Sequence, residues 1–176
     1  AAGAFSTNNT IPITYTSSNT AVATVSGSTI TITGAGTTSI TANQAGNDGY
    51  FPAAPVSRTL TVNKANLTIR AVDTVKTVGQ ANPVFTITFT GFVLGQTVAN
   101  LLTPPVAATI ATAATAPGYY PITLSGATSN NYNIIYANGR LTILPLTGTG
   151  EKYINAWRNG AGNLSVKVYS NEPVLG

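Results

Sequence analysis

Few side chains in this sequence could perform catalysis. General acid–base chemistry uses a His or a pair of carboxylates with separated pKa values, and the 176-residue chain contains no His. Its four acids are widely spaced: Asp48, Asp73, Glu151 and Glu172. Ser and Thr are abundant, but a hydroxyl nucleophile needs an activating base, and no convincing Lys partner accompanies them. The sequence therefore predicts a protein that is not an enzyme and holds no cofactor.

Metal ligands are equally sparse. The chain lacks both Cys and His, so it has no thiolate or imidazole ligand for zinc or iron. Calcium prefers clustered carboxylate and carbonyl oxygens, and Asn47-Asp48-Gly49 is the candidate loop. A single carboxylate between Asn and Gly is more typical of a turn whose side chains cap backbone groups. We therefore predict a turn there and no metal site.

Aromatic side chains supply the candidate ligand contacts, because a saccharide ring can stack on an exposed aromatic side chain. They form three groups: Tyr50-Phe51; Phe85, Phe89 and Phe92; and Tyr119-Tyr120 with Tyr132 and Tyr136. Phe85 and Phe89 have same-face spacing within a strand, and Tyr in a β-sandwich usually packs or forms a structural corner. We predict a core role for the last two groups. Tyr50 and Phe51 remain as the candidate ligand contacts, at a loop tip.

A row of threonines, Thr29, Thr31 and Thr33, has the spacing of one strand face. Such a row invites an ice-binding interpretation. A single short row is more typical of the solvent face of a strand, and this is the interpretation we favour.

Composition limits the partners. Hydrophobic residues make up 43% of the chain, enough for packed cores, and the net charge of +4 comes from basic residues scattered singly. Without a basic run or cluster, nucleic acid is not an expected partner. No apolar run approaches the ~20 residues that span a bilayer, and residues 1–25 lack a signal-peptide pattern. We therefore expect no membrane span. Because the chain starts at Ala1 without Met, we also expect an excised fragment.

The elements that must position these residues are strands. Period-two alternation dominates, as in Ile11–Tyr15 and Thr29–Thr33, and no amphipathic helical window competes with it. Ser26-Gly27-Ser28 separates two strands, and Asn138-Gly139 predicts a hairpin between Tyr132–Tyr136 and Arg140–Leu144. The pattern predicts an all-β fold of tandem immunoglobulin-like β-sandwiches.

Two similar segments of the sequence predict the domain boundaries. Arg58–Val62 and Arg140–Ile143 look like equivalent closing strands, with Leu60 and Leu141 eighty-one positions apart. We expect one domain over residues 1–64, a second over 65–146, and a partial β segment over 147–176. Only residues 63–66 separate the first closing strand from the next opening strand, which is too short for a flexible tether. A stiff joint and a rod are the expected result.

Residues 10–64 resemble a bacterial Ig-like repeat of the kind strung along adhesins and invasin-type proteins, with the first strand truncated. The resemblance depends on three segments: Thr14-Tyr15-Thr16-Ser17-Ser18-Asn19, Ala21-Val22-Ala23-Thr24-Val25 and Gly34-Ala35-Gly36-Thr37-Thr38.

Residues 65–145 resemble the MBG repeat of bacterial surface proteins. The motifs are Lys76-Thr77-Val78-Gly79-Gln80-Ala81-Asn82-Pro83, Phe89-Thr90-Gly91-Phe92, Gly118-Tyr119-Tyr120-Pro121-Ile122 and Asn131-Tyr132. Val78 stands where the repeat has Tyr, and both residues suit a half-buried strand position.

The tail, with Tyr153–Trp157 and Leu164–Tyr169, resembles the first half of the C-terminal sorting domain of type IX secretion. The alternative is that the tail opens a further sandwich or pairs with an edge of the preceding one.

These resemblances imply a non-catalytic structural or adhesive module of a large bacterial cell-surface protein, located outside the cell. The implied partners are a surface ligand, glycan or protein, and secretion machinery through the tail. A carbohydrate-binding module is the alternative function.

Overall fold

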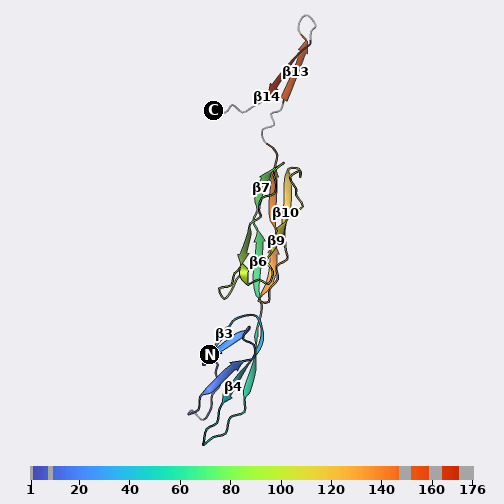
Figure 1. The fold of residues 1–176 in the computed structure, drawn as a ribbon. Coiled ribbons are helices and arrows are strands. Elements are labelled where there is room, and N and C mark those ends of the chain that lie inside the picture. The colour runs from blue at the N-terminus through green and yellow to red at the C-terminus, as the bar shows by residue number, and fades with distance from the viewer. Residues whose placement is uncertain (1, 8–9, 147–151, 159–163, 171–176) are drawn as a thin grey trace, which may run out of the picture. The chain divides into compact units, whose positions relative to one another are not determined.

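The computed structural model describes residues 2–7, 10–146, 152–158 and 164–170, and their regular structure is almost entirely β-strand (Figure 1). The one helical element in these ranges is a three-residue 3-10 helix, η1 (Val98–Asn100), which Thr97 caps at its start. The prediction of an all-β fold is confirmed, and the arrangement in several sheets agrees with a β-sandwich architecture.

The chain forms two compact units, each assembled from separate segments. Unit 1 consists of Ala1–Val72, Phe85–Ala108 and Ile122–Gly139, and unit 2 consists of Asp73–Val84, Thr109–Pro121 and Arg140–Gly176. The boundaries expected from the sequence, after residues 64 and 146, stay predictions.

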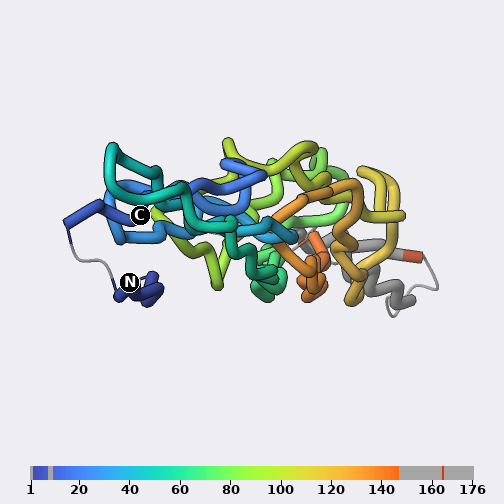
Figure 2. Tube along the Cα trace, turned by 90° about the horizontal axis from the view of Figure 1, so that it is seen from below, coloured from blue at the N-terminus to red at the C-terminus, as the bar shows by residue number. Residues whose placement is uncertain are grey.

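The N-terminal part of unit 1 contains a three-stranded antiparallel sheet and a hairpin. The sheet has the order β1 (Ile13–Ser17), β4 (Gly36–Gln44), β5 (Val56–Val62), and the hairpin joins β2 (Ala23–Ser26) to β3 (Thr29–Ile32). Figure 2 shows the blue and teal segments of these strands side by side. Gly27 opens the two-residue hairpin loop with a φ of 56°, a left-handed conformation that glycine adopts without strain. The turn predicted at Ser26-Gly27-Ser28 is therefore confirmed.

A small core lies beneath this sheet. Val22 and Ala23 are buried, and so is Thr38, whose hydroxyl has three hydrogen-bonding neighbours. Thr38 Oγ1 lies 2.8 Å from Ser17 Oγ and 3.3 Å from Ser18 Oγ, and it accepts a hydrogen bond from the backbone N–H of Asn19 at 2.9 Å. Because a buried hydroxyl is costly without partners, this cluster compensates Thr38 and holds the end of β1 against β4.

The remaining strands up to residue 144 form two further sheets. One has the order β11 (Tyr132–Ala137), β6 (Ala65–Ala71), β8 (Ile87–Thr90), and the other has the order β7 (Thr74–Thr77), β12 (Gly139–Leu144), β10 (Gly118–Ser125), β9 (Val106–Ala108). β8 runs antiparallel to β6 and β9 runs antiparallel to β10, whereas β11 runs parallel to β6 and β12 runs parallel to β7.

The hairpin predicted at Asn138-Gly139 is wrong. Tyr132–Ala137 pairs with β6 and Gly139–Leu144 pairs with β7, so the chain passes from one sheet to the other at this point. A type I′ hairpin turn needs positive φ at both central residues, and Gly139 is not among the residues with positive φ. Glycine serves another purpose here, because a Cβ on Gly139 would lie 2.6 Å from the carbonyl oxygen of Ala71.

The same crossing occurs in the neighbouring strand of the sheet. β6 ends at Ala71 and β7 begins at Thr74 in the other sheet, and Asp73 accepts a hydrogen bond from the backbone N–H of Arg140 through Oδ1 at 2.9 Å. Two parallel neighbours therefore change sheets together. The glycine allows the close approach at this level, and the aspartate satisfies the freed backbone N–H group.

The cores follow the strand alternation. In unit 1 the fully buried side chains include Leu67 and Ile69 of β6 and Ile122 of β10. In unit 2 Leu141 and Ile143 of β12 are buried, and so is Lys76, which is 5% exposed. The Lys76 ammonium donates to the carbonyl oxygens of Thr112 at 2.7 Å and Gln80 at 3.1 Å, so the charge is buried with two hydrogen-bond acceptors.

Two residues, Asn63 and Lys64, connect β5 to β6. The connection is two residues shorter than the sequence predicts, because β6 already begins at Ala65. The backbone N–H of Ala65 donates to the carbonyl oxygen of Asn131 at 3.0 Å, so the connection is hydrogen-bonded at its end.

The tail contains an antiparallel pair, β13 (Lys152–Arg158) and β14 (Leu164–Ser170), with Lys152 opposite Ser170. Both predicted strand segments are present. Glu151, Glu172 and residues 159–163 lie outside the described residues, and the resemblance of this segment to a sorting domain stays a prediction.

The sheet crossing generates the first testable prediction. Replacing Gly139 with Ala places a methyl group against the Ala71 backbone, so we expect the free energy of unfolding in urea to fall by about 1–3 kcal/mol. Gly49→Ala is the matched control, since its Cβ meets only Asn47 Oδ1 at 3.8 Å, and it should change the value by less than about 0.5 kcal/mol. Equal stabilities of the two variants would contradict the close approach.

Candidate functional site

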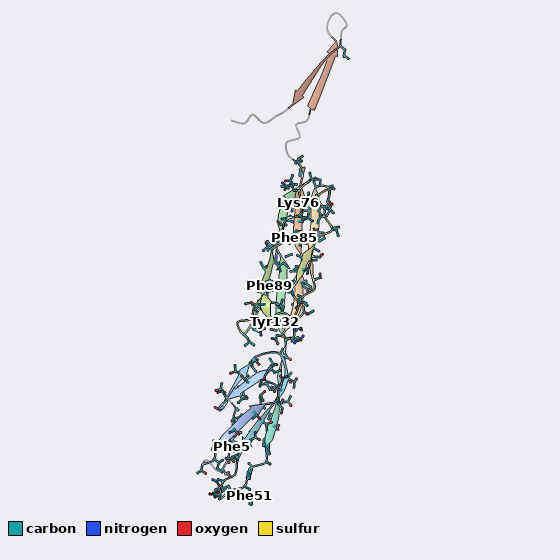
Figure 3. The ribbon with its side chains drawn as sticks, in the orientation of Figure 1. Phe5, Phe51, Lys76, Phe85, Phe89 and Tyr132 are labelled. Carbon is teal, nitrogen blue, oxygen red and sulfur yellow. The ribbon has the colours of Figure 1, made fainter. Side chains whose placement is uncertain are left out.

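Tyr50 and Phe51 lie on the connection between β4 and β5. Tyr50 is 61% exposed and Phe51 is 98% exposed, and Figure 3 shows Phe51 at the end of this loop. The following residues, Pro52 to Pro55, are also exposed. An exposed aromatic pair on a loop is available to stack against a ligand, so the placement agrees with the expectation of a loop tip and leaves the ligand role as a proposal.

The turn before Tyr50 uses Asn47 as its organising residue. Asn47 and Tyr50 exchange two backbone hydrogen bonds at 2.9 and 3.2 Å, and Asn47 Oδ1 accepts the backbone N–H of Gly49 at 3.0 Å. This is an Asx turn, in which the side chain caps the backbone. The Asn47-Asp48-Gly49 segment is therefore a turn, as we interpreted it from the sequence.

The two described acids have no shared site. Asp48 is an exposed residue of the Asx turn in unit 1, and Asp73 holds the Arg140 backbone in unit 2. Among the residues that the structure describes, no three His, Cys, Asp or Glu side chains gather as a metal-binding group.

The phenylalanine group packs. Phe89 and Phe92 have ring centroids 5.6 Å apart, and Phe92 meets Tyr132 edge-on at 5.5 Å. Phe85 precedes β8 and is half-buried; Figure 3 labels Phe85, Phe89 and Tyr132. The Tyr132 side chain is 2% exposed, and its hydroxyl accepts from the Val93 N–H at 3.1 Å and donates to the Val93 carbonyl at 3.3 Å. These rings are structural.

The other tyrosines are held at their hydroxyl groups or rings. Tyr120 donates to the Ala116 carbonyl at 3.0 Å, and the hydroxyl oxygen of Tyr136 accepts the Ala127 N–H at 2.8 Å. Tyr119 is 72% exposed, and the Arg140 guanidinium lies 4.9 Å from its ring centroid. This cation–π contact covers one face of the most exposed ring of the group, and Tyr136 is also exposed, at 37%. The core role predicted for these tyrosines is therefore wrong for Tyr119 and Tyr136, which lie at the surface.

The threonine row lies on the exposed face of the β2–β3 hairpin. Thr29, Thr31 and Thr33 are all exposed, and Thr31 faces Thr24 across the hairpin. The Thr33 hydroxyl donates to the Thr20 carbonyl at 2.8 Å. The row is short and one of its hydroxyls is engaged by the backbone, which agrees with an ordinary solvent face.

A polar groove of about 520 Å³ lies in unit 1, and the sequence did not predict it. Its lining includes Asn19 after β1, Lys64 between β5 and β6, Asn100 of η1, and Asn130 and Asn131 before β11. None of the lining residues is aromatic or acidic. These side chains come from four separated stretches of sequence, so no local motif could have indicated the groove.

Three of the asparagine side chains in the groove are oriented by the backbone. Asn19 Oδ1 accepts the Ala21 N–H at 3.1 Å, Asn100 Oδ1 accepts the Thr97 N–H at 2.8 Å, and Asn131 Oδ1 accepts the Ala35 N–H at 2.9 Å. The Lys64 ammonium donates to the Ser129 carbonyl at 2.9 Å. Each of these three amide oxygens accepts one backbone N–H, and Asn131 Nδ2 donates to Gln96 Oε1 at 3.4 Å. Donors that remain for a ligand are Nδ2 of Asn19 and Asn100 and the Lys64 ammonium.

An apolar groove of about 490 Å³ lies on the inner side of the first sheet. Tyr15, Ile40 and Leu60 contribute to it, together with this chain's own residues Ala2 to Ala4. The lining residues do not indicate what kind of ligand would bind in this groove, so it adds no candidate function.

The described part of the chain contains no helix long and apolar enough to cross a membrane.

Comparison with known proteins gives one family match. Residues 67–142 match the family model of the MBG domain (YGX type), inside the segment where the sequence motifs resemble that repeat. This match supports the MBG resemblance and a surface-associated structural repeat over these residues. The match does not extend over residues 1–66, so the resemblance of residues 10–64 to a bacterial Ig-like repeat stays a prediction.

No curated protein matches the chain. Among solved structures, the S-layer protein rSbsC is similar over 91% of this chain, with 13% sequence identity and a TM-score of 0.30. The chain spans 28% of the length of that protein. At this TM-score the likeness decides neither fold nor function.

The aromatic packing generates a second prediction. Tyr132→Phe removes the hydroxyl that pairs with both backbone groups of Val93, so we expect the free energy of unfolding to fall by about 1–3 kcal/mol. The control is Tyr119→Phe, which alters an exposed ring and should change stability by less than about 0.5 kcal/mol. Thermal and urea unfolding of both variants measure the difference. A Tyr132→Phe variant as stable as the control would show that the Val93 contact contributes nothing.

Proposed function

We propose that the protein is a non-catalytic structural and adhesive module of a large bacterial cell-surface protein, acting as a stalk or adhesion repeat outside the cell. The observation that carries the proposal is the MBG family match over residues 67–142. The sequence has only four acidic residues, widely spaced, and no His, and this composition supports a non-enzymatic role. In this proposal the flanking segments are an Ig-like sandwich before the MBG repeat and a partial sorting domain after it.

The short connection between β5 and β6 supports a stalk. Only Asn63 and Lys64 lie between the strands, and a link this short has little freedom compared with a Gly/Ser-rich linker. Three hydrogen bonds inside unit 1 hold its surroundings: Ala35 N–H to Asn131 Oδ1, Ala65 N–H to the Asn131 carbonyl, and Lys64 Nζ to the Ser129 carbonyl. Restricting the link in this way favours a stiff joint.

Small-angle X-ray scattering tests the stalk. We expect the native chain to give an extended pair-distance distribution, because the joint resists bending. A variant with six Gly/Ser residues inserted between Asn63 and Lys64 is the control, and its distribution should broaden as the joint becomes flexible. A compact native particle with freely varying domain orientation, or an insertion that leaves the profile unchanged, would rule out the stiff stalk.

A carbohydrate-binding module is the second candidate function, and the exposure of Tyr50 and Phe51 favours it. An exposed aromatic ring can stack on the apolar face of a sugar while the tyrosine hydroxyl hydrogen-bonds. The proposed ligand contacts are Tyr50 and Phe51. They lie on a loop, where residues can change without disturbing the strands.

A glycan array tests this alternative. If Tyr50 binds a sugar, the native chain should give a specific hit that Tyr50→Ala reduces about tenfold or more, as expected for an aromatic contact near a binding hot spot. Tyr119→Ala, which removes another exposed tyrosine ring, is the matched control and should retain the hit. An array on which the folded native chain gives no hit, or on which both variants behave alike, would refute sugar binding at Tyr50.

A further inference from the structure

We propose that the polar groove of unit 1 binds an acidic saccharide of the uronic acid class, with the sugar carboxylate against Lys64 Nζ. The inference goes beyond the structural role proposed above and depends on residues other than Tyr50 and Phe51. It follows from the hydrogen-bonding groups that the groove leaves available, from their charge and from the size of the space.

Three residues of the groove keep hydrogen-bond donors for a ligand: Asn19, Asn100 and Lys64. The backbone uses the amide oxygens of Asn19 and Asn100, which accept the N–H groups of Ala21 and Thr97. Because an amide oxygen directed at the backbone places its NH₂ group on the opposite side, each of these asparagines keeps Nδ2 as a donor. Lys64 donates one hydrogen bond, to Ser129, and its ammonium carries two further N–H groups. A ligand rich in acceptor oxygens complements this arrangement.

Charge favours an anion among such ligands. Lys64 is the charged residue of the groove lining. Unit 1 contains one acid, Asp48, which lies on the β4–β5 connection and is not part of the lining. The positive charge of Lys64 is therefore not neutralised within the groove. Hydrogen bonds between an ammonium and a carboxylate are about twice as strong as neutral ones, so a carboxylate is the expected contact.

The size and chemistry of the groove favour a saccharide over an acidic peptide. Its volume of about 520 Å³ is within the range of small-molecule sites. An extended peptide brings backbone N–H donors that need acceptors, but the Asn19, Asn100 and Asn131 oxygens each already accept one backbone N–H. Saccharide hydroxyls can accept as well as donate. Because no aromatic residue lines the groove, binding there depends on hydrogen bonds and charge instead of ring stacking.

Isothermal titration of the full chain with oligogalacturonate and oligomannuronate tests the inference, with a neutral galactose oligomer as the comparison ligand. We expect at least one uronate to bind and the neutral oligomer to bind about tenfold more weakly, since the carboxylate contact is lost. Raising the salt concentration should weaken uronate binding. If neither uronate binds to the folded chain, or if the neutral oligomer binds equally well, the proposal is wrong.

Variants then locate the site. Asn19→Asp and Asn100→Asp keep the oxygen that accepts the backbone N–H, so the fold is retained, but each replaces the Nδ2 donor with a negative charge. Each should weaken uronate binding about tenfold or more, and Lys64→Gln should do the same.

Two controls make the same chemical changes outside the groove. Asn138→Asp and Arg70→Gln alter exposed residues that do not line it, and both should bind uronate like the native chain. Equal losses in the controls and the groove variants would overturn the assignment. Thermal unfolding confirms that each variant is folded. The scattering test of the stalk uses no ligand, so either proposal can fail without the other.

Discussion

The close approach of Gly139 to Ala71 is the constraint on which the arrangement of residues 65–144 depends. At this level two parallel neighbours leave one sheet and enter another, β6 continuing as β7 and β11 as β12. The approach leaves no room for a Cβ at residue 139, where the nearest Ala71 atom would lie 2.6 Å away. Because of the crossings, the strands before and after each one belong to different sheets. Leu67 and Ile69 of β6, which lies before a crossing, are buried in unit 1. Leu141 and Ile143 of β12, which lies after a crossing, are buried in unit 2. The boundary between the units coincides with both crossings.

Neutral polar side chains make many of the contacts that hold the loops of this chain, which has twelve charged residues. Thr38, Tyr132 and Asn131 each join backbone or side-chain groups from segments far apart in sequence. Such contacts are effective because a buried N–H or carbonyl group left without a partner costs about 1–3 kcal/mol. In the residues that the structure describes, no buried side-chain nitrogen or oxygen lacks a partner. A chain with few charges can thus specify its loops by hydrogen bonding.

The sequence predicted local elements well and their partners less well. Alternation identified the strands, and Gly27 marked a real hairpin, because both signals depend on neighbouring residues. Asn138-Gly139 carried the same kind of turn signal but belongs to a sheet crossing, which depends on Ala71 more than sixty positions earlier in the chain. The structural role of Phe89 followed from strand spacing, and that of Tyr132 followed from the way tyrosine usually packs in a β-sandwich. The exposure of Tyr119 did not, since Arg140 holds that ring at the surface through a contact that spacing cannot reveal.

The groove shows why binding residues in such repeats escape pattern recognition. Asn19, Lys64 and Asn100 look like ordinary turn and connection residues, and each does have a local structural role: Asn19 and Asn100 cap backbone N–H groups, and Lys64 holds a carbonyl. The structural role also sets the chemistry that remains. An asparagine that caps a backbone N–H with its oxygen keeps its NH₂ group as a donor, so the caps Asn19 and Asn100 each bring a donor to the groove lining. The selectivity for acceptor-rich ligands then follows from the way the loops are held, without any residue whose only purpose is binding.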